Sequence, residues 1–309
     1  MGGPNGHKVL TVPTYTLPSS HKDGARRDKV LIFFIPGNPG LIAYYQPFLN
    51  TLRALLNEAE SHPSSTTSYH IHGQNLLGFT DTDHAVPFGP RPHAIPPFTL
   101  EDQITHVSST LAGTLTAGFA KVLLIGHSVG AYIAIEAFHR HHVSRKATPS
   151  LHSAILLFPT ISHIARSPNG KRLSLLADTP FLDRNAHRFA RWFLLLWPSF
   201  LLYAFLRVIL RLPAQGARVT TSWLKSRDGV WQALHMGKDE MRTITEERGD
   251  RWVADECREE FVERRRGEGK GRVRVVVDEG GLPHAFCLRH GEEVAGKVKE
   301  WVVDMVGGV

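Results

Sequence analysis

Residues 126–130 read Gly-His-Ser-Val-Gly, and the segments on either side of this pentapeptide constrain the fold more than any other feature of the chain. The preceding residues Val122–Ile125 form a short apolar run, which is typical of a buried strand. The following residues 131–138 carry apolar side chains at helical spacing. A tight Gly-x-Ser-x-Gly turn between a strand and a helix is a nucleophile elbow, which exposes the serine hydroxyl at a helix N-terminus. We therefore predict that Ser128 is a nucleophile.

Apolar strand patterns alternate with amphipathic helix patterns along the rest of the chain. This alternation predicts the α/β class, and with the elbow it predicts an α/β-hydrolase fold: a mainly parallel sheet, helices on both faces and an inserted helical cap. We predict one domain over residues 1–309, with the cap within residues 160–247. The predicted strands are 8–17 (an edge strand, because it contains Pro13), 30–35, 69–71, 122–125, 154–158 and 273–277, and the predicted helices include 48–56, one that starts at Leu100, and 294–306.

Composition narrows the classes of partner and cofactor. The 309 residues include 42% hydrophobic and 21% charged residues and carry a formal net charge of +7. A basic chain suits nucleic acid or an anionic membrane surface, but no basic helix with interleaved aromatic residues is present, so we expect no nucleic-acid partner. Cys257 and Cys287 lack metal-site spacing, and the histidines at 139, 141 and 142 lack a second ligand set. We predict no metal and no other cofactor.

In this fold the nucleophile is followed along the chain by an acid and then by a histidine base in the loop after the last strand. The chain has 18 histidines, and His284 is singled out because it follows the predicted last strand and precedes the C-terminal helix, so we predict that it is the general base. Backbone N–H groups must bind the oxyanion. We expect one from Val129 and the other from the Pro36–Gly40 turn, with Asn38 as its donor.

The acid is open among three aspartates. Residues 231–236 could form a strand that ends at Asp239, although 238–247 has a helical pattern. Asp250 precedes Arg251–Val253 but follows no convincing apolar strand, residues 241–245 being the best available, and Asp255 is the third aspartate. Asp278 directly follows the last predicted strand, and its closeness to His284 in sequence makes it a poorer candidate.

Two segments depart from a plain alternation of strands and helices. The loop over residues 73–97 is long enough to predict a functional or lid-type loop. Residues 192–206 are almost wholly apolar, contain Pro198 and are shorter than the roughly 20 residues of a membrane-spanning helix, so a bilayer span is disfavoured. A buried cap helix and a helical hairpin inserted in a lipid surface remain. The flanking arginines and the aromatic residues favour the hairpin: Arg188, Arg191, Arg207, Arg211, Trp192, Trp197 and Tyr203.

Four segments closely resemble the lipid droplet-associated hydrolases, and the chain looks like a fungal-type member. They are residues 33–48 (FFIPGNPGLIAYYQPF), 100–106 (LEDQITH), 126–132 (GHSVGAY) and 282–286 (LPHAF). The resemblance extends from about Val30 to Val303. It implies an α/β-hydrolase fold, a serine-esterase triad, and attachment to lipid droplets and to the endoplasmic reticulum membrane on its cytosolic face. Neutral lipids such as sterol esters or acylglycerols are the implied substrates.

The resemblance also assigns the triad. Ser128 matches the family's nucleophile and His284 its base, and the Asp-x-Trp-Val motif of the acid matches residues 250–253, which makes Asp250 the implied acid. The strand that precedes this motif in the family has no counterpart in this sequence.

Three functions are compatible with these features. The first is a serine ester hydrolase that acts on neutral lipid esters and docks on a droplet or membrane through residues 192–210. The second is a catalytically weak or inactive lipid-storage protein of the droplet, which the missing strand favours. The third is an acyltransferase, in which an alcohol replaces water in the second step.

Overall fold

The described strands form one mainly parallel sheet. The computed structural model describes residues 12–20, 27–90, 93–115, 117–143, 151–160, 180–245 and 280–307. Within these ranges the strand order is β1-β3-β2-β4-β5. The antiparallel β1 pairs only with β3, whereas β3, β2, β4 and β5 run parallel. This confirms the predicted α/β class. The strands are β1 (Thr14–Leu17), β2 (Asp28–Ile35), β3 (Thr67–Gln74), β4 (Lys121–His127) and β5 (Leu151–Leu157).

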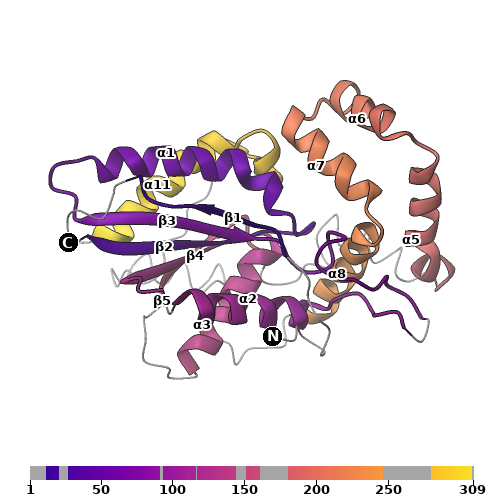
Figure 1. Cartoon of the computed structure of the whole chain (residues 1–309), viewed down its shortest axis with the longest axis horizontal. Coiled ribbons are helices and arrows are strands. Elements are labelled where there is room, and N and C mark those ends of the chain that lie inside the picture. The colour runs from indigo at the N-terminus through magenta and orange to yellow at the C-terminus, as the bar shows by residue number, and fades with distance from the viewer. Residues whose placement is uncertain are drawn as a thin grey trace.

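Helices cover both faces of the sheet, as predicted (Figure 1). One face is covered by α1 (Gln46–Glu60), which follows the short helix η2 (Ile42–Tyr45), and by α11 (Gly291–Gly307). The other face is covered by α2 (Leu100–Leu115) and α3 (Val129–Val143). A sheet buried on both sides explains why β2 and β4 have continuous apolar runs.

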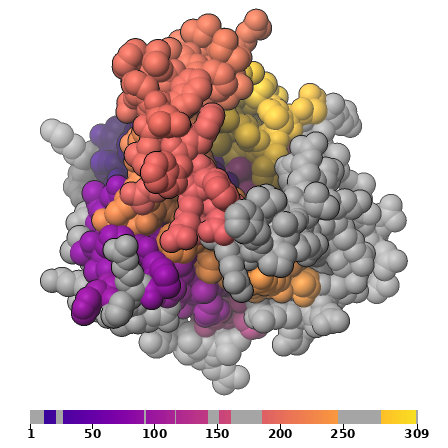
Figure 2. Space-filling model, turned by 90° about the vertical axis from the view of Figure 1, so that its right-hand side faces the viewer, coloured from indigo at the N-terminus to yellow at the C-terminus, as the bar shows by residue number. Residues whose placement is uncertain are grey.

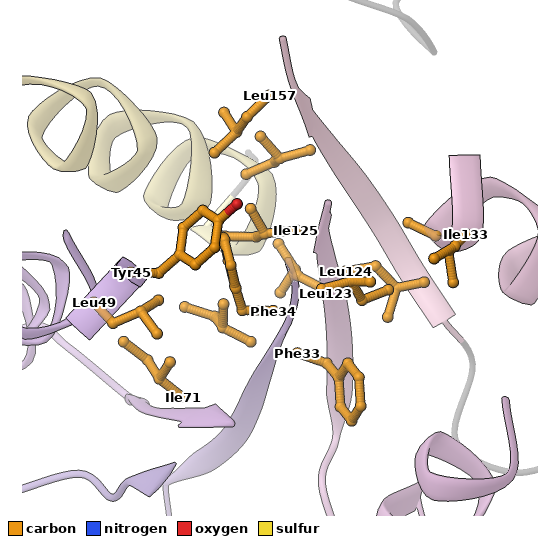
Figure 3. Close-up of a cluster of buried hydrophobic side chains, with 14 of the residues drawn as sticks. Phe33, Phe34, Tyr45, Leu49, Ile71, Leu123, Leu124, Ile125, Ile133 and Leu157 are labelled. Atoms are coloured by element: carbon orange, nitrogen blue, oxygen red, sulfur yellow. The ribbon is translucent and has the colours of Figure 1, made fainter. Parts of the chain in front are cut away.

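The core is built around β2, whose side chains alternate between the two faces. Phe34 lies on the side of Tyr45 and Leu49, and Phe33 lies on the opposite side (Figure 3). The Phe34 and Tyr45 rings are 4.7 Å apart. Ile32 pairs with Ile71 on one side of the strand and with Leu123 on the other. This packing holds the carboxyl ends of β2 and β4 side by side, and the candidate site begins there.

Four helices follow β5 in the described sequence, and we call them the cap helices. They are α5 (Pro180–Leu195), α6 (Ser199–Val208), α7 (Ala214–Lys225) and α8 (Gly229–Thr243). In Figure 1, α8 lies nearest the sheet, and α5 and α6 lie on the outer side of the cap. The strand considered for residues 231–236 is wrong, because these residues lie inside α8. Its buried positions Gln232, Met236 and Glu240 recur every four residues, so the buried stripe contains polar side chains that disguise the helical period.

The long loop after β3 is fastened to α8. The Gln232 amide group binds both the N–H and the carbonyl oxygen of Phe98, at 2.9 and 2.8 Å. Asp228 accepts hydrogen bonds from His84 and from the Phe88 amide, at 3.1 and 3.2 Å. These contacts hold the loop against the innermost cap helix.

The apolar segment at residues 192–210 is exposed, so its interpretation as a buried cap helix is wrong. All large exposed hydrophobic side chains of the described residues lie between Phe189 and Leu210, with Trp192 72% and Leu196 77% exposed. No single helix in the described ranges is long and apolar enough to cross a membrane, although the pair 185–195 and 199–208 passes the same test together. That pair bends by 98° at its break, so it is a right-angled corner and not a hairpin. We call these exposed side chains, carried by α5 and α6 (Figure 2), the apolar ridge.

Candidate active site

The Gly-x-Ser-x-Gly turn has the backbone of a nucleophile elbow. Strand β4 ends at His127, helix α3 begins at Val129, and Ser128 between them has a φ of 55°. A Cβ on Gly126 would lie 2.3 Å from the Gly130 carbonyl oxygen, and a Cβ on Gly130 would lie 2.4 Å from the Ile35 carbonyl oxygen. Both positions therefore require glycine. The motif is needed to fold the turn against β2 and to lift the serine out of the strand.

Ser128 and His284 are in contact, although 156 residues separate them. The Ser128 hydroxyl lies 2.9 Å from His284 Nε2, and the histidine is carried by the loop that precedes η4 (Phe286–Leu288). The side chain of Thr160, which the sequence did not single out, lies 3.2 Å from the same hydroxyl. The structure thus brings together the serine and the histidine that the sequence predicts as nucleophile and base.

The protonation of His284 suits proton transfer. Partial desolvation lowers the pKa of His284, so the imidazole is neutral at physiological pH. When the ring proton is on Nδ1, the Nε2 lone pair faces the Ser128 hydroxyl and can accept its proton. The arrangement can therefore increase the nucleophilicity of Ser128.

Of the four aspartates considered as the acid, the structure describes only Asp239. Asp239 lies on α8, and its carboxylate accepts a hydrogen bond from the Leu100 amide at the start of α2, at 2.7 Å. It therefore fastens the cap to α2 instead of contacting the base. Asp250, Asp255 and Asp278 lie outside the described residues, as does the predicted strand 273–277. Within the described ranges no carboxylate forms a hydrogen bond with His284.

The turn after β2 passes directly against the nucleophile. A Cβ on Gly37 would lie 2.9 Å from the Ser128 Cβ, so there is no room for a larger residue at position 37. The peptide bond between Asn38 and Pro39, in the same turn, is cis. The Asn38 side-chain amide donates to the Ala233 carbonyl oxygen and to Glu240 on α8, at 3.0 and 3.2 Å. The cap therefore holds Asn38 by its side chain, next to the elbow.

Glu240 is buried on the inner side of α8. Burial raises its pKa to about 8 and the hydrogen bond from Asn38 opposes this shift, so Glu240 is mainly protonated at neutral pH. Sequence reasoning missed Glu240, because an acidic residue near the end of an amphipathic helix is usually exposed.

Two further residues that sequence reasoning missed connect the parts of the site. The Tyr45 hydroxyl lies 2.7 Å from His127 Nδ1 and accepts a hydrogen bond from the Gly37 amide at 3.0 Å. His127 Nε2 lies 2.9 Å from the His284 carbonyl oxygen. Both residues lie in recognisable sequence motifs, but only the fold shows that they meet. In the described part of the chain, no three His, Cys, Asp or Glu side chains are close enough together to hold a metal ion.

Comparisons with known proteins agree with this geometry. The chain resembles the peroxisomal alpha-beta-hydrolase Lpx1 of Saccharomyces cerevisiae, with a TM-score of 0.56 and 12% identity over 97% of this chain and 90% of that one. It also resembles the N-acyl homoserine lactonase AidH, with a TM-score of 0.50 and 13% identity over 97% of this chain and 96% of that one. Both similarities support the α/β-hydrolase fold.

Sequence comparison is more specific. The lipid droplet-associated hydrolase of Gallus gallus is 28% identical over 89% of this chain and 85% of its own length. The protein of the same name from Dictyostelium discoideum is 26% identical over 88% of this chain and 87% of its own length. The model of the family described as lipid-droplet associated hydrolase matches residues 28–287. The chain therefore belongs to the lipid droplet-associated hydrolase family.

Proposed function

We propose that this protein is a serine ester hydrolase that acts on neutral lipid esters, of the sterol ester or acylglycerol type, at the surface of lipid droplets. The observation that carries the proposal is the 2.9 Å contact between the Ser128 hydroxyl and His284 Nε2 above a glycine-strained elbow. The neutral state of His284 supports it, because a general base must be unprotonated before attack. The family and the fold support hydrolysis, and ester chemistry is our inference from the serine nucleophile.

The proposed reaction has two steps. Ser128 Oγ bonds to the ester carbonyl carbon while its proton moves to His284 Nε2. The protonated histidine then gives that proton to the departing alcohol, which leaves an acyl-serine. Water attacks the acyl-serine with the same proton transfers and releases the fatty acid. The carbonyl oxygen becomes negative in both attacks, and we propose that the backbone N–H groups of Asn38 and Val129 stabilise it.

The helix start and the turn support this assignment of the oxyanion site. Val129 is the first residue of α3, where backbone N–H groups have no intrahelical acceptor and the helix dipole favours negative charge. Asn38 follows Gly37, which lies against Ser128. Since α8 holds the Asn38 side-chain amide, the backbone of Asn38 is the part that can serve the oxyanion. We propose Asp250 as the acid that orients His284, on the strength of its sequence motif.

The apolar ridge is the proposed contact with lipid. Eleven large hydrophobic side chains are exposed there, whereas soluble proteins rarely expose a continuous apolar surface of this size. The inner side of the same corner is packed: Leu202 and Leu206 are 5% and 4% exposed and contact Ala217 on α7. The ridge is therefore presented outward by a folded support, and it suits insertion into a lipid monolayer. The cytosolic face of the endoplasmic reticulum membrane offers the same type of surface.

Polar contacts hold the corner open. Pro198 immediately precedes α6, and the Lys225 ammonium group donates hydrogen bonds to the carbonyl oxygens of Leu194, in the last turn of α5, and of Trp197, between the two helices. A cation at a helix C-terminus is favourable, because the last carbonyl groups there have no intrahelical partner. This contact keeps the end of α5 turned away from α6.

Turnover of two substrates tests the function. Hydrolysis of soluble p-nitrophenyl butyrate and of emulsified triolein is measured for the wild type, Ser128→Ala and Ser61→Ala, the last being an exposed serine at the end of α1. We expect Ser128→Ala to lose activity by a factor on the order of 10³ or more, and Ser61→Ala to retain it. A wild type as inactive as Ser128→Ala on both substrates would instead favour a droplet protein without catalysis. Addition of glycerol, with product analysis, separates hydrolysis from acyl transfer.

A further inference from the structure

A chain of buried hydrogen bonds joins three separate parts of the candidate site. It runs from the Gly37 amide to the Tyr45 hydroxyl, from this hydroxyl to His127 Nδ1, and from His127 Nε2 to the His284 carbonyl oxygen. The groups at its two ends determine which atom donates and which accepts in each hydrogen bond. The His284 carbonyl oxygen can only accept, so His127 Nε2 carries the ring proton and Nδ1 accepts from the tyrosine O–H. The tyrosine oxygen in turn accepts from the Gly37 N–H.

The chain is consistent only with a neutral His127. The residue is 4% exposed, and burial, aided by the neighbouring His284 ring, lowers its pKa to about 3 despite the hydrogen bond to the His284 carbonyl. The ring is therefore neutral throughout the physiological range and stays in one tautomer. Its two nitrogens have opposite roles, one donating and one accepting, and each has a partner.

Aromatic packing sets the position of the two members of this chain. The Tyr45 ring contacts Phe34 and Phe286, with centroids 4.7 and 6.3 Å away, and the His127 ring contacts Phe286 at 5.0 Å. Tyr45 is 3% exposed. Because these contacts hold the two rings in place, the Tyr45 hydroxyl points at His127.

The base is held by contacts with two neighbouring elements, the ends of β4 and β5. His284 is exposed, and η4 begins two residues later. Its carbonyl oxygen is held by His127, and its ring lies beside Phe158 and His127, with centroids 6.0 and 5.1 Å away. The contact with His127 therefore connects the loop that carries His284 to the carboxyl end of β4.

We propose that Tyr45 and His127 are positioning residues. Through this chain of hydrogen bonds they fix two segments relative to Ser128: the loop that carries His284 and the turn after β2 that carries Gly37 and Asn38. The proposal rests on the proposed function for its catalytic consequence. Both side chains are buried away from solvent. Both act through backbone groups, the Gly37 N–H on one side and the His284 carbonyl on the other.

The catalytic test removes one hydroxyl at a time. Tyr45→Phe keeps the packed ring and breaks the chain, whereas Tyr44→Phe removes the neighbouring hydroxyl, which contacts Thr220 on α7. With p-nitrophenyl butyrate we expect Tyr45→Phe to lower kcat about tenfold at unchanged KM, because misplaced catalytic groups reduce the rate without weakening binding. We expect Tyr44→Phe to leave both constants unchanged.

Two substitutions at the histidine sharpen the result. His127→Gln retains an N–H donor within reach of the His284 carbonyl and should retain more activity than His127→Leu, which has none. Equal loss in the two variants, or wild-type kcat in Tyr45→Phe, would overturn the proposal. Melting temperatures for all four variants show whether a loss of kcat accompanies unfolding.

A second readout does not depend on turnover. In protein labelled with ¹⁵N at histidine and glycine, we expect the His127 ring in the wild type to be a neutral Nε2–H tautomer from pH 5 to 8. We expect Tyr45→Phe to increase hydrogen exchange of the Gly37 amide and to shift the His284 ring resonances, and Tyr44→Phe to do neither. If the wild type hydrolyses no ester but these changes occur, the proposed function fails and the positioning chain stands. Unchanged resonances in Tyr45→Phe would refute the chain.

Discussion

The inner and outer parts of the cap have opposite kinds of surface. The inner helix α8 and the residue before it, Asp228, bury polar groups: Asp228, Gln232 and Glu240 form hydrogen bonds that hold the cap on the core. The outer helices α5 and α6, which lie on the face of the molecule shown in Figure 2, expose large apolar side chains to the surroundings.

The contrast assigns attachment to lipid and support of the candidate site to different parts of the cap. A polar group buried without a partner costs free energy, so the contacts of α8 fix how the cap lies on the core. Exposed apolar groups weaken solubility and gain free energy only when they leave water. The outer surface thus suits a lipid phase, and the inner surface suits the transmission of a fixed geometry to the site. Substitutions on the two surfaces should therefore change different properties of the protein.

The largest effect is expected at the apolar ridge. A fully buried large side chain contributes about 1.5–3 kcal/mol, so Trp192→Gln, Leu196→Gln and Phe200→Gln together should weaken binding to triolein droplets by at least about a thousandfold. Flotation with droplets coated with phosphatidylcholine measures the binding. The control carries Trp192→Leu, Leu196→Ile and Phe200→Leu and should float like the wild type. Equal flotation of the two triple variants would show that the ridge is not the lipid contact.

The inner cap should respond in stability and not in droplet binding. Asp228 is buried and accepts from His84, Arg227 and the Phe88 amide, so Asp228→Ala should lower the free energy of unfolding by about 3–5 kcal/mol. Asp81 binds the Arg227 amide at the exposed surface, and Asp81→Asn should cost less than about 1 kcal/mol. Urea denaturation measures both. A similar cost for the two variants would mean that the buried cluster does not fasten the cap.

The same cluster should make stability depend on pH. Burial alone lowers the pKa of His84, but its hydrogen bonds to Asp228 and Asp83 outweigh this and raise the pKa to about 9, above the ordinary 6.5. Because the folded state binds the proton more tightly, this stabilisation is complete below pH 6.5, declines as the pH rises, and is lost above about 9. Relative to His84→Asn, the wild type should lose on the order of 2 kcal/mol between pH 6 and 9.5. A pH-independent difference would contradict the raised pKa.

The smallest effect is expected where α8 holds the turn beside the nucleophile. Since the pKa of Glu240 is raised to about 8, the group is mainly neutral at pH 7, and Glu240→Gln keeps an acceptor for Asn38. We expect Glu240→Gln to retain the wild-type kcat at pH 7, and Glu240→Leu to lose a few-fold because Asn38 loses one of its two partners. A large loss in Glu240→Gln would indicate that the carboxylate itself is required.

Much of the core could be predicted from the sequence because its signals are local. The run Val122–Ile125, the glycines at 126 and 130 and the apolar helix after them specify a strand, a sharp turn and a helix within twenty residues. His284 could be predicted from its place in the chain order. Its contact with Ser128 follows because loops at the carboxyl ends of parallel strands meet at one edge of the sheet.

Other features depend on neighbours that are distant in sequence. The apolar composition of residues 192–210 is the same whether the segment is buried or exposed, and only the packing of Leu202 and Leu206 on α7 shows which side faces outward. The hydrogen-bonded chain through Tyr45 and His127 depends on the meeting of η2, the end of β4 and two loops, and no periodicity marks a histidine as neutral. The polar stripe of α8 defeats a method that looks for apolar residues at helical spacing.

Labelling with a fluorophosphonate tests directly whether Ser128 is a nucleophile activated by His284. The modified residue and the rate of its modification are measured. The intact protein is labelled, digested and analysed by mass spectrometry, with His284→Gln as the comparison. We expect the adduct on Ser128, and a labelling rate about a hundredfold lower in His284→Gln, because the serine then lacks its base. An adduct on another residue, no adduct at all, or equal rates in the two proteins would contradict the account.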